Sequence, residues 1–155
     1  RINKIIHDSC LGTYGVVSLV LGLLIRLALI LTLVEQGFSL VSSLSIGFAS
    51  GKLSIILSRN FFTNSKFAKT GSIVGKISQK RLFSATFIWI LPTLVIFPFS
   101  GILLGILLMV LVISIMGLKS KKALGGITGD ILGAIAFLTE LVFFLGIVIA
   151  QVIIN

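Results

Sequence analysis

LGGITGDILG, at residues 124–133, is a glycine-rich stretch that leads directly into the last long apolar run of the chain, residues 131–154. A glycine-rich turn before a helix leaves backbone N–H groups free at the helix N-terminus, where the positive end of the helix dipole favours phosphate. Asp130 would lie in the first turn of this helix, where it could hold a divalent cation that bridges to phosphate oxygens. The stretch therefore predicts a phosphate site, with or without a metal ion, at the start of a helix.

The same stretch also fits a purely structural role. Gly125, Gly129 and Gly133 recur at every fourth residue, a spacing typical of membrane helices that pack closely. Asp130 would then only cap the helix or interact with its dipole. The local pattern leaves both interpretations open.

The composition predicts an integral membrane protein. Of the 155 residues, 57% are hydrophobic and only 11% are charged, which is far more apolar than a soluble domain of this length requires. We therefore expect an all-α polytopic membrane helix bundle, with about five transmembrane helices in a single integral membrane domain over residues 1–155. The predicted spans are residues 16–34, 38–57, 82–98, 101–118 and 131–154. Pro92, inside the third span, predicts a kink.

The basic residues predict the orientation of these spans. Two lie before the first span, six lie in the long loop of residues 59–81, and three follow the fourth span. With five spans, these three segments fall on one side of the membrane, and the loops on the other side contain no Lys or Arg. The positive-inside rule places the basic side, and with it the 124–133 stretch, in the cytoplasm. We expect an integral protein of the cytoplasmic (inner) membrane whose active face is cytoplasmic.

Two basic residues lie inside predicted spans. Lys52 is expected near the cytoplasmic end of its helix, where its side chain can reach the interface. Arg26 lies in the middle of its span, where an ionisable group marks either a functional site or a buried ion pair. Glu140 is also in mid-span, and we predict that it pairs with Arg26.

Several kinds of chemistry are excluded or weakened by the composition. Cys10 and His7 are the only residues of their types, which leaves little for a zinc site, an internal disulfide or a Ser-His-Asp triad. The net charge of +9 is concentrated in loops that meet lipid headgroups, so we expect a lipid bilayer and no nucleic acid as the partner of these charges. Residues 69–76, KTGSIVGK, depart from the phosphate-binding loop pattern in spacing and in the residue that follows Lys76.

Four separated strings together resemble the cobalamin synthase family, and the resemblance covers essentially the whole chain. The family string D-S-x-x-G-x-x-G matches residues 8–15, and GKI follows at residues 75–77. The string L-G-G-x-T-G-D-x-L-G-A matches residues 124–134 in full, and ELV follows at residues 140–142. The order and spacing of these strings make the resemblance far more specific than any one of them.

The resemblance implies a transferase of vitamin B12 biosynthesis. Such an enzyme joins α-ribazole or its 5′-phosphate to adenosylcobinamide-GDP and releases GMP, with Mg²⁺ as cofactor. It implies catalytic and Mg²⁺-binding roles for Asp8 and Asp130. The residues expected to bind substrate or phosphate are Ser9, Gly12, Lys76, Gly125, Gly126, Thr128 and Gly129. The oligomeric state is left open.

Family members typically carry an upstream acidic string, D-G-x-A-D-x-x-D-G, that this sequence lacks. Because the first Met is Met109, we expect the chain to be the C-terminal part of a longer protein. Three alternatives to the transferase remain. Mid-membrane Arg26 and Glu140 would also suit a transporter subunit, although the expected inverted repeat is not visible. A CDP-alcohol phosphotransferase would require a D-G-x-x-A-R signature, which is absent, and a purely structural membrane subunit would not explain why acids and glycines cluster.

Overall fold

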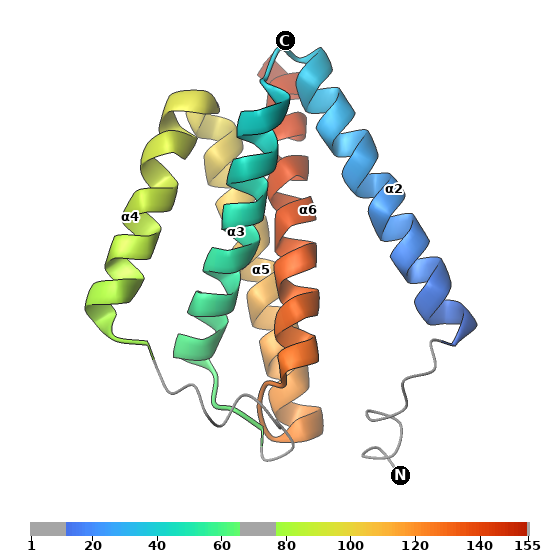
Figure 1. Cartoon of the computed structure of the whole chain (residues 1–155), viewed down its shortest axis with the longest axis vertical. Coiled ribbons are helices and arrows are strands. Elements are labelled where there is room, and N and C mark those ends of the chain that lie inside the picture. The colour runs from blue at the N-terminus through green and yellow to red at the C-terminus, as the bar shows by residue number, and fades with distance from the viewer. Residues whose placement is uncertain (1–11, 66–76, 155) are drawn as a thin grey trace.

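The computed structural model describes residues 12–65 and 77–154, and these residues form a bundle of helices. The helices are α2 (Thr13–Glu35), α3 (Leu40–Phe61), α4 (Gln79–Ile96), α5 (Phe99–Leu124) and α6 (Gly129–Ile154). Successive helices run in opposite directions, so α3 and α5 end where α2, α4 and α6 begin (Figure 1). The prediction of an all-α bundle with about five spans is confirmed.

Each predicted span lies largely inside one helix, and most helices extend further than the apolar runs indicate. The clearest extension is in α5, which continues past the predicted end at residue 118 to Leu124. Helices α2, α3, α5 and α6 are long and apolar enough to cross a membrane. The exception is α4, which has 18 residues and begins with the polar sequence Gln79-Lys80-Arg81. It remains α-helical through Pro92, and a kink at that residue stays a prediction.

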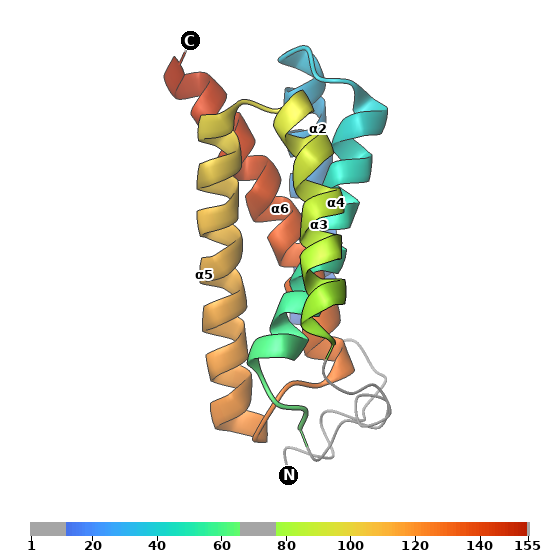
Figure 2. The same cartoon turned by 90° about the vertical axis from the view of Figure 1, so that its left-hand side faces the viewer.

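Helix α6 is the centre of the bundle, with α5, α3 and α2 packed around it (Figure 2). The phenylalanine rings of α6 pack directly against glycines of the neighbouring helices. A Cβ atom on Gly22, Gly47 or Gly105 would come within 3 Å of the ring of Phe137, Phe144 or Phe143, respectively. Real Cβ contacts are not this short, so these glycines let the helices approach closely. The glycines of the predicted spans therefore determine how the rings of α6 pack.

Helix α2 diverges from the rest of the bundle toward its N-terminal end (Figure 1). Its buried residues, Gly22, Leu29, Ile30 and Leu33, all lie in its C-terminal two-thirds. The apolar side chains before Gly22 are about half exposed or more, and Tyr14 is 90% exposed. No other described helix packs over the residues of α2 before Gly22, and their exposed apolar side chains are suited to contact with lipid.

Candidate active site

The turn between α5 and α6 is built by Gly125. This glycine has φ +70° and ψ +8°, and its N–H donates to the carbonyl of Lys121 at 3.0 Å. A C-cap in the left-handed region favours glycine, because any other residue would be strained by its Cβ atom at this positive φ. The Ser120 hydroxyl donates to the carbonyl of Gly126 at 2.6 Å. Gly125 therefore has a defined structural role as the C-cap of α5, which differs from the helix-packing role that its spacing suggests.

The segment that follows α3 holds this turn in place. Asn64 and Ile127 form a parallel β-bridge, in which the Ser65 N–H donates to the Ile127 carbonyl at 3.0 Å and the Ile127 N–H donates to the Thr63 carbonyl at 2.9 Å. The Ser65 hydroxyl also donates to the carbonyl of Leu124 at 2.6 Å. Several backbone groups of the turn are thus bonded within the protein, and these bonds join the turn to the segment that follows α3.

Gly126 is required where these two segments cross. A Cβ atom at this position would lie 2.5 Å from the Ser65 nitrogen and 2.6 Å from both the Asn64 carbonyl carbon and the Thr63 oxygen. These are backbone atoms held by the β-bridge, so they cannot move without breaking it. Gly126 allows the close approach, and the structure leaves no room at its Cα for a ligand on that side.

We expect Gly126→Ala to destabilise the protein by about 1–3 kcal/mol, because the added methyl group overpacks a fixed backbone contact. Gly133→Ala is the matched control. Gly133 lies on an exposed part of α6, and a Cβ atom there would meet nothing within 4 Å, so the substitution should stabilise the helix by about 0.5–1 kcal/mol. The thermal unfolding midpoints of both variants in detergent test this expectation, and equal midpoints would contradict it.

The next residues of the stretch, 128–130, lead from the buried turn to the exposed start of α6. Thr128 is buried and its carbonyl accepts the Leu132 N–H at 3.1 Å, while Gly129 and Asp130 are exposed in the first turn of α6. Within the described part of the chain, the N–H groups of Gly129 and Asp130 donate to no acceptor. A helix N-terminus with free N–H groups attracts anions. Of the predicted phosphate-binding residues, Gly129 has the geometry for that role.

The spacing of Gly129 and Gly133 does not reflect helix packing among the described residues. A Cβ atom on either glycine would have no neighbour within 4 Å. Close packing of α6 occurs further along, where a Cβ atom on Gly146 would lie 2.5 Å from the Gly105 nitrogen. Gly125 and Gly126 thus shape the turn, and the described chain gives Gly125, Gly129 and Gly133 no helix-packing partner.

Basic residues gather at the end of the bundle where α6 begins, because α3 and α5 end and α4 begins at that end (Figure 1). They lie at the end of α3, the start of α4 and the end of α5: Arg59, Lys80, Arg81, Lys119, Lys121 and Lys122. All except Arg59, which is half-buried, are exposed. We call these six residues, together with Gly129 and Asp130, the basic rim. Its positive charge suits a phosphate-rich or anionic ligand.

Of the remaining predicted site residues, three lie outside the described part of the chain and one, Gly12, lies at the same end of the bundle as the rim. Asp8, Ser9 and Lys76 lie outside the described residues. Gly12 caps α2 in an extended conformation (φ −65°, ψ 163°) at the same end of the bundle, and it is exposed. Among the described residues, no three His, Cys, Asp or Glu side chains come together in a way that could hold a metal ion.

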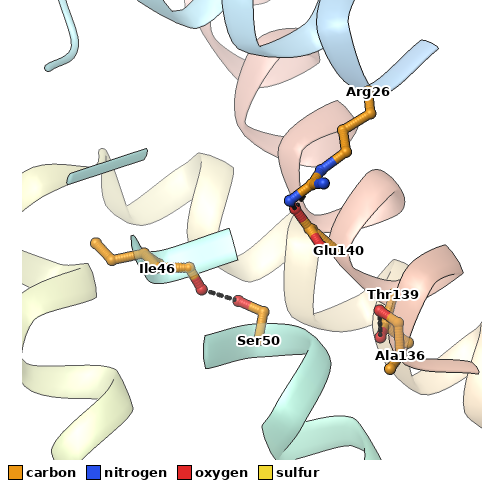
Figure 3. A network of polar contacts seen from close by, with 6 residues as sticks. All are labelled: Arg26, Ile46, Ser50, Ala136, Thr139 and Glu140. Carbon is orange, nitrogen blue, oxygen red and sulfur yellow. Dashed lines mark hydrogen bonds and ion pairs between the residues drawn. The ribbon is translucent and has the colours of Figure 1, made fainter. Parts of the chain in front are cut away.

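Arg26 and Glu140 form an ion pair in the interior of the bundle. The Arg26 Nε atom donates to Glu140 Oε1 at 2.8 Å, and Arg26 Nη2 lies 2.6 Å from the same oxygen (Figure 3). The Glu140 side chain is 7% exposed and that of Arg26 is 30% exposed. The predicted partners therefore meet. At the usual helical rise, Glu140 lies about 17 Å along α6 from Gly129, so it is remote from the basic rim.

A set of serines on α3, which the sequence analysis did not assign, binds the neighbouring helices. The Trp89 Nε1–H of α4 donates to the Ser50 hydroxyl at 2.9 Å, and the Thr139 hydroxyl of α6 contacts the Ser54 hydroxyl at 2.8 Å. Ser50 and Thr139 also donate to carbonyls one turn back, as Figure 3 shows for Ile46 and Ala136. Their spacing on α3, four residues apart, was the available signal. Such hydrogen bonds between helices stabilise packing inside a membrane.

A comparison with protein families decides the identity of the chain at the family level. The model of the cobalamin-5-phosphate synthase family matches residues 1–148. The chain belongs to this family. The resemblance that the sequence motifs predict is thereby confirmed.

Curated relatives support the same assignment. The chain is 36% identical over 157 aligned residues to the adenosylcobinamide-GDP ribazoletransferase of Clostridium perfringens (strain SM101 / Type A), and 35% identical to the protein of the same name from strain 13 / Type A. Each alignment covers 97% of this chain and 59% of the relative. The chain thus spans somewhat more than half the length of the relatives it matches. No solved structure matches it significantly.

In this cobalamin-5-phosphate synthase family protein, residues 124–134 form two structural parts. Residues 124–127 build a rigid turn that is fastened to α3, and residues 128–130 begin α6. The first part fixes the position of the second. The one exposed carboxylate of the stretch, Asp130, is therefore held at a defined place on the basic rim.

Proposed function

We propose that this protein joins α-ribazole or its 5′-phosphate to adenosylcobinamide-GDP and releases GMP, forming adenosylcobalamin or its phosphate in the last steps of vitamin B12 biosynthesis. The proposal rests on the family membership of residues 1–148. It is supported by the names of the relatives, which are adenosylcobinamide-GDP ribazoletransferases. Family membership favours this reaction over the transporter and CDP-alcohol phosphotransferase alternatives.

The reaction is a phosphoryl transfer. The ribazole hydroxyl attacks the cobinamide-linked phosphorus, the new phosphorus–oxygen bond forms, and the bond to the GMP oxygen breaks as the hydroxyl proton is released. Such reactions need mainly positioning and neutralisation of charge. The basic rim supplies both: lysines and arginines to attract the diphosphate, and the α6 N-terminus at Gly129 to orient a phosphate group.

Asp130 is the carboxylate that we assign to this site. It is exposed in the first turn of α6, close in sequence to the free N–H group of Gly129. Mg²⁺ is commonly bound by one or two carboxylates together with water and substrate phosphates, so Asp130 can supply one ligand and Asp8 is the expected second. When bound, Mg²⁺ would neutralise charge on the transferred phosphoryl group.

We also propose that the basic rim faces the cytoplasm and that the protein is in the cytoplasmic (inner) membrane. The described Lys and Arg residues outside the helix interiors all lie at this end of the bundle. The opposite turns, at residues 36–39 and 97–98, contain none. This distribution agrees with the positive-inside rule, and a cytoplasmic rim would be accessible to a diphosphate substrate from the cytoplasm.

The test is a GMP-release assay with the full-length gene product in membrane vesicles. Adenosylcobinamide-GDP and α-ribazole are supplied with Mg²⁺ or with excess chelator, and α-ribazole 5′-phosphate is compared as the acceptor. We expect GMP release that needs an acceptor and falls at least about tenfold when Mg²⁺ is removed. GMP release that does not depend on an acceptor would contradict the transfer, and full activity in chelator would remove Mg²⁺ from the proposal.

A further inference from the structure

Lys52 lies in the middle of α3 rather than near an interface. It is about 18 Å from the Leu40 end of the helix and about 14 Å from the Phe61 end, at the usual rise. Its Nζ atom lies 5.0 Å from the centroid of the Phe48 ring, one turn back toward Leu40. The side chain therefore points away from the end of α3 at the basic rim, and the expectation that it reaches that interface is wrong.

Lys52 belongs to the same polar cluster as the Arg26–Glu140 pair. These three side chains line one cavity of about 210 Å³ between α2, α3 and α6. The cavity thus contains two cations and one carboxylate, and Glu140 binds Arg26 through Oε1. Whichever cation Glu140 holds, the cluster keeps one positive charge in excess. An uncompensated charge at this depth is costly.

The described part of the chain does not supply the missing carboxylate. The chain has four acidic residues. Of the described acidic residues, Glu140 already binds Arg26, and Glu35 and Asp130 lie at helix ends, far along their helices from this cluster. A second copy of the same segment would bring the same excess of cations. The compensating acid must come from a different helix.

A groove suited to such a helix adjoins the cluster. It lies between α3 and α4, has a volume of about 680 Å³, and is lined mainly by apolar side chains such as Ile56, Ile88 and Pro92. Lys52 and Phe48 line both the groove and the polar cavity. Ser42 and Ser45 add hydroxyl groups to the groove wall. A lipid chain would match the apolar wall but would leave Lys52 uncompensated.

We propose that the α3–α4 groove is the docking site for a transmembrane helix that carries an Asp or Glu in mid-membrane, and that this carboxylate pairs with Lys52. The partner is defined by its charge: its acid balances the cluster of Arg26, Lys52 and Glu140. Its apolar side chains fill the groove. This docking site is separate from the proposed reaction at the basic rim.

The test uses the full-length gene product in its native membrane, with a photoreactive phenylalanine analogue in place of Phe48, which is 57% exposed. Mass spectrometry of the crosslinked peptides identifies what lies in the groove. We expect adducts with a membrane span that contains an Asp or Glu near its middle. Adducts with lipid alone, or with a span that lacks such an acid, would overturn the proposal.

A charge exchange then tests the pairing itself. Lys52→Glu should lower the yield of folded protein in mild detergent about tenfold, which corresponds to about 1.4 kcal/mol. Changing the acid of the crosslinked span to Lys in the same protein should restore the yield. Lys80→Glu, on the exposed first turn of α4, is the control: Lys52 keeps its charge in this variant, so the second change should lower the yield and not restore it. Failure of the exchange to restore the Lys52→Glu variant would refute the pairing.

Discussion

Replacing Glu140 with Ala is expected to destabilise the protein by about 3 kcal/mol. The substitution leaves the Arg26 guanidinium without its partner in the membrane interior, where an unpaired charge costs about this amount. It also leaves Lys52 and Arg26 facing the same cavity without an intervening carboxylate, which adds repulsion. The free energy of unfolding in mixed detergent micelles, measured by circular dichroism, is the appropriate quantity.

The pair can be tested as a unit. Arg26→Leu with Glu140→Leu should recover most of the loss, because replacing both partners of a buried ion pair with apolar groups is often nearly neutral. Glu35→Gln is the control: Glu35 is exposed at the end of α2, so its substitution should change the free energy by less than about 0.5 kcal/mol. A double variant no more stable than Glu140→Ala would show that the ion pair is not the source of the effect.

Much of the fold follows from hydrophobic length and charge. Five apolar runs that each cross a bilayer, joined by connections that do not cross it, require successive helices to be antiparallel, and a lipid environment requires that their backbone groups bond internally. The meeting of Arg26 and Glu140 follows from the same constraint, because two opposite charges in mid-span stabilise each other. These features depend on local composition, so the sequence predicts them well.

The role of the glycines could not be predicted so directly. Gly125, Gly129 and Gly133 recur at every fourth residue, yet Gly125 shapes a turn together with Gly126, and Gly129 and Gly133 have no packing neighbour in the described chain. The difference depends on Ser65 and the residues before it, which are about 60 residues away in sequence and cross directly over Gly126. A crossing of this kind depends on tertiary structure and leaves no periodic signal.

Lys52 shows a second limit of sequence reasoning. Its expected proximity to the interface assumed that the helix ends near residue 57, but α3 continues to Phe61. The additional turn moves Lys52 toward the middle of the helix. Helix ends are set by capping and tertiary contacts that apolar runs do not report, and here the error changes the interpretation of a charged residue.

Asp130→Asn is expected to lower GMP release by about a hundredfold or more. The substitution keeps the size of the side chain and its position in the first turn of α6, but it removes the negative charge that a metal ion or a reacting group requires. Because Asp130 is exposed and makes no ion pair among the described residues, the stability of the protein should change by less than about 0.5 kcal/mol. A large loss of activity with unchanged stability is the signature of a residue that acts in the reaction.

The most direct measurement compares the kcat for GMP release of the wild type, Asp130→Asn and Glu35→Gln in the same vesicles at matched amounts of folded protein. If the basic rim is the site of the transfer, kcat falls about a hundredfold or more for Asp130→Asn, whereas Glu35→Gln, at the opposite end of the bundle, keeps the wild-type value. If Asp130→Asn retains the wild-type kcat, the start of α6 is not the reaction site, and the 124–127 turn serves only to join α5, α6 and the segment that follows α3.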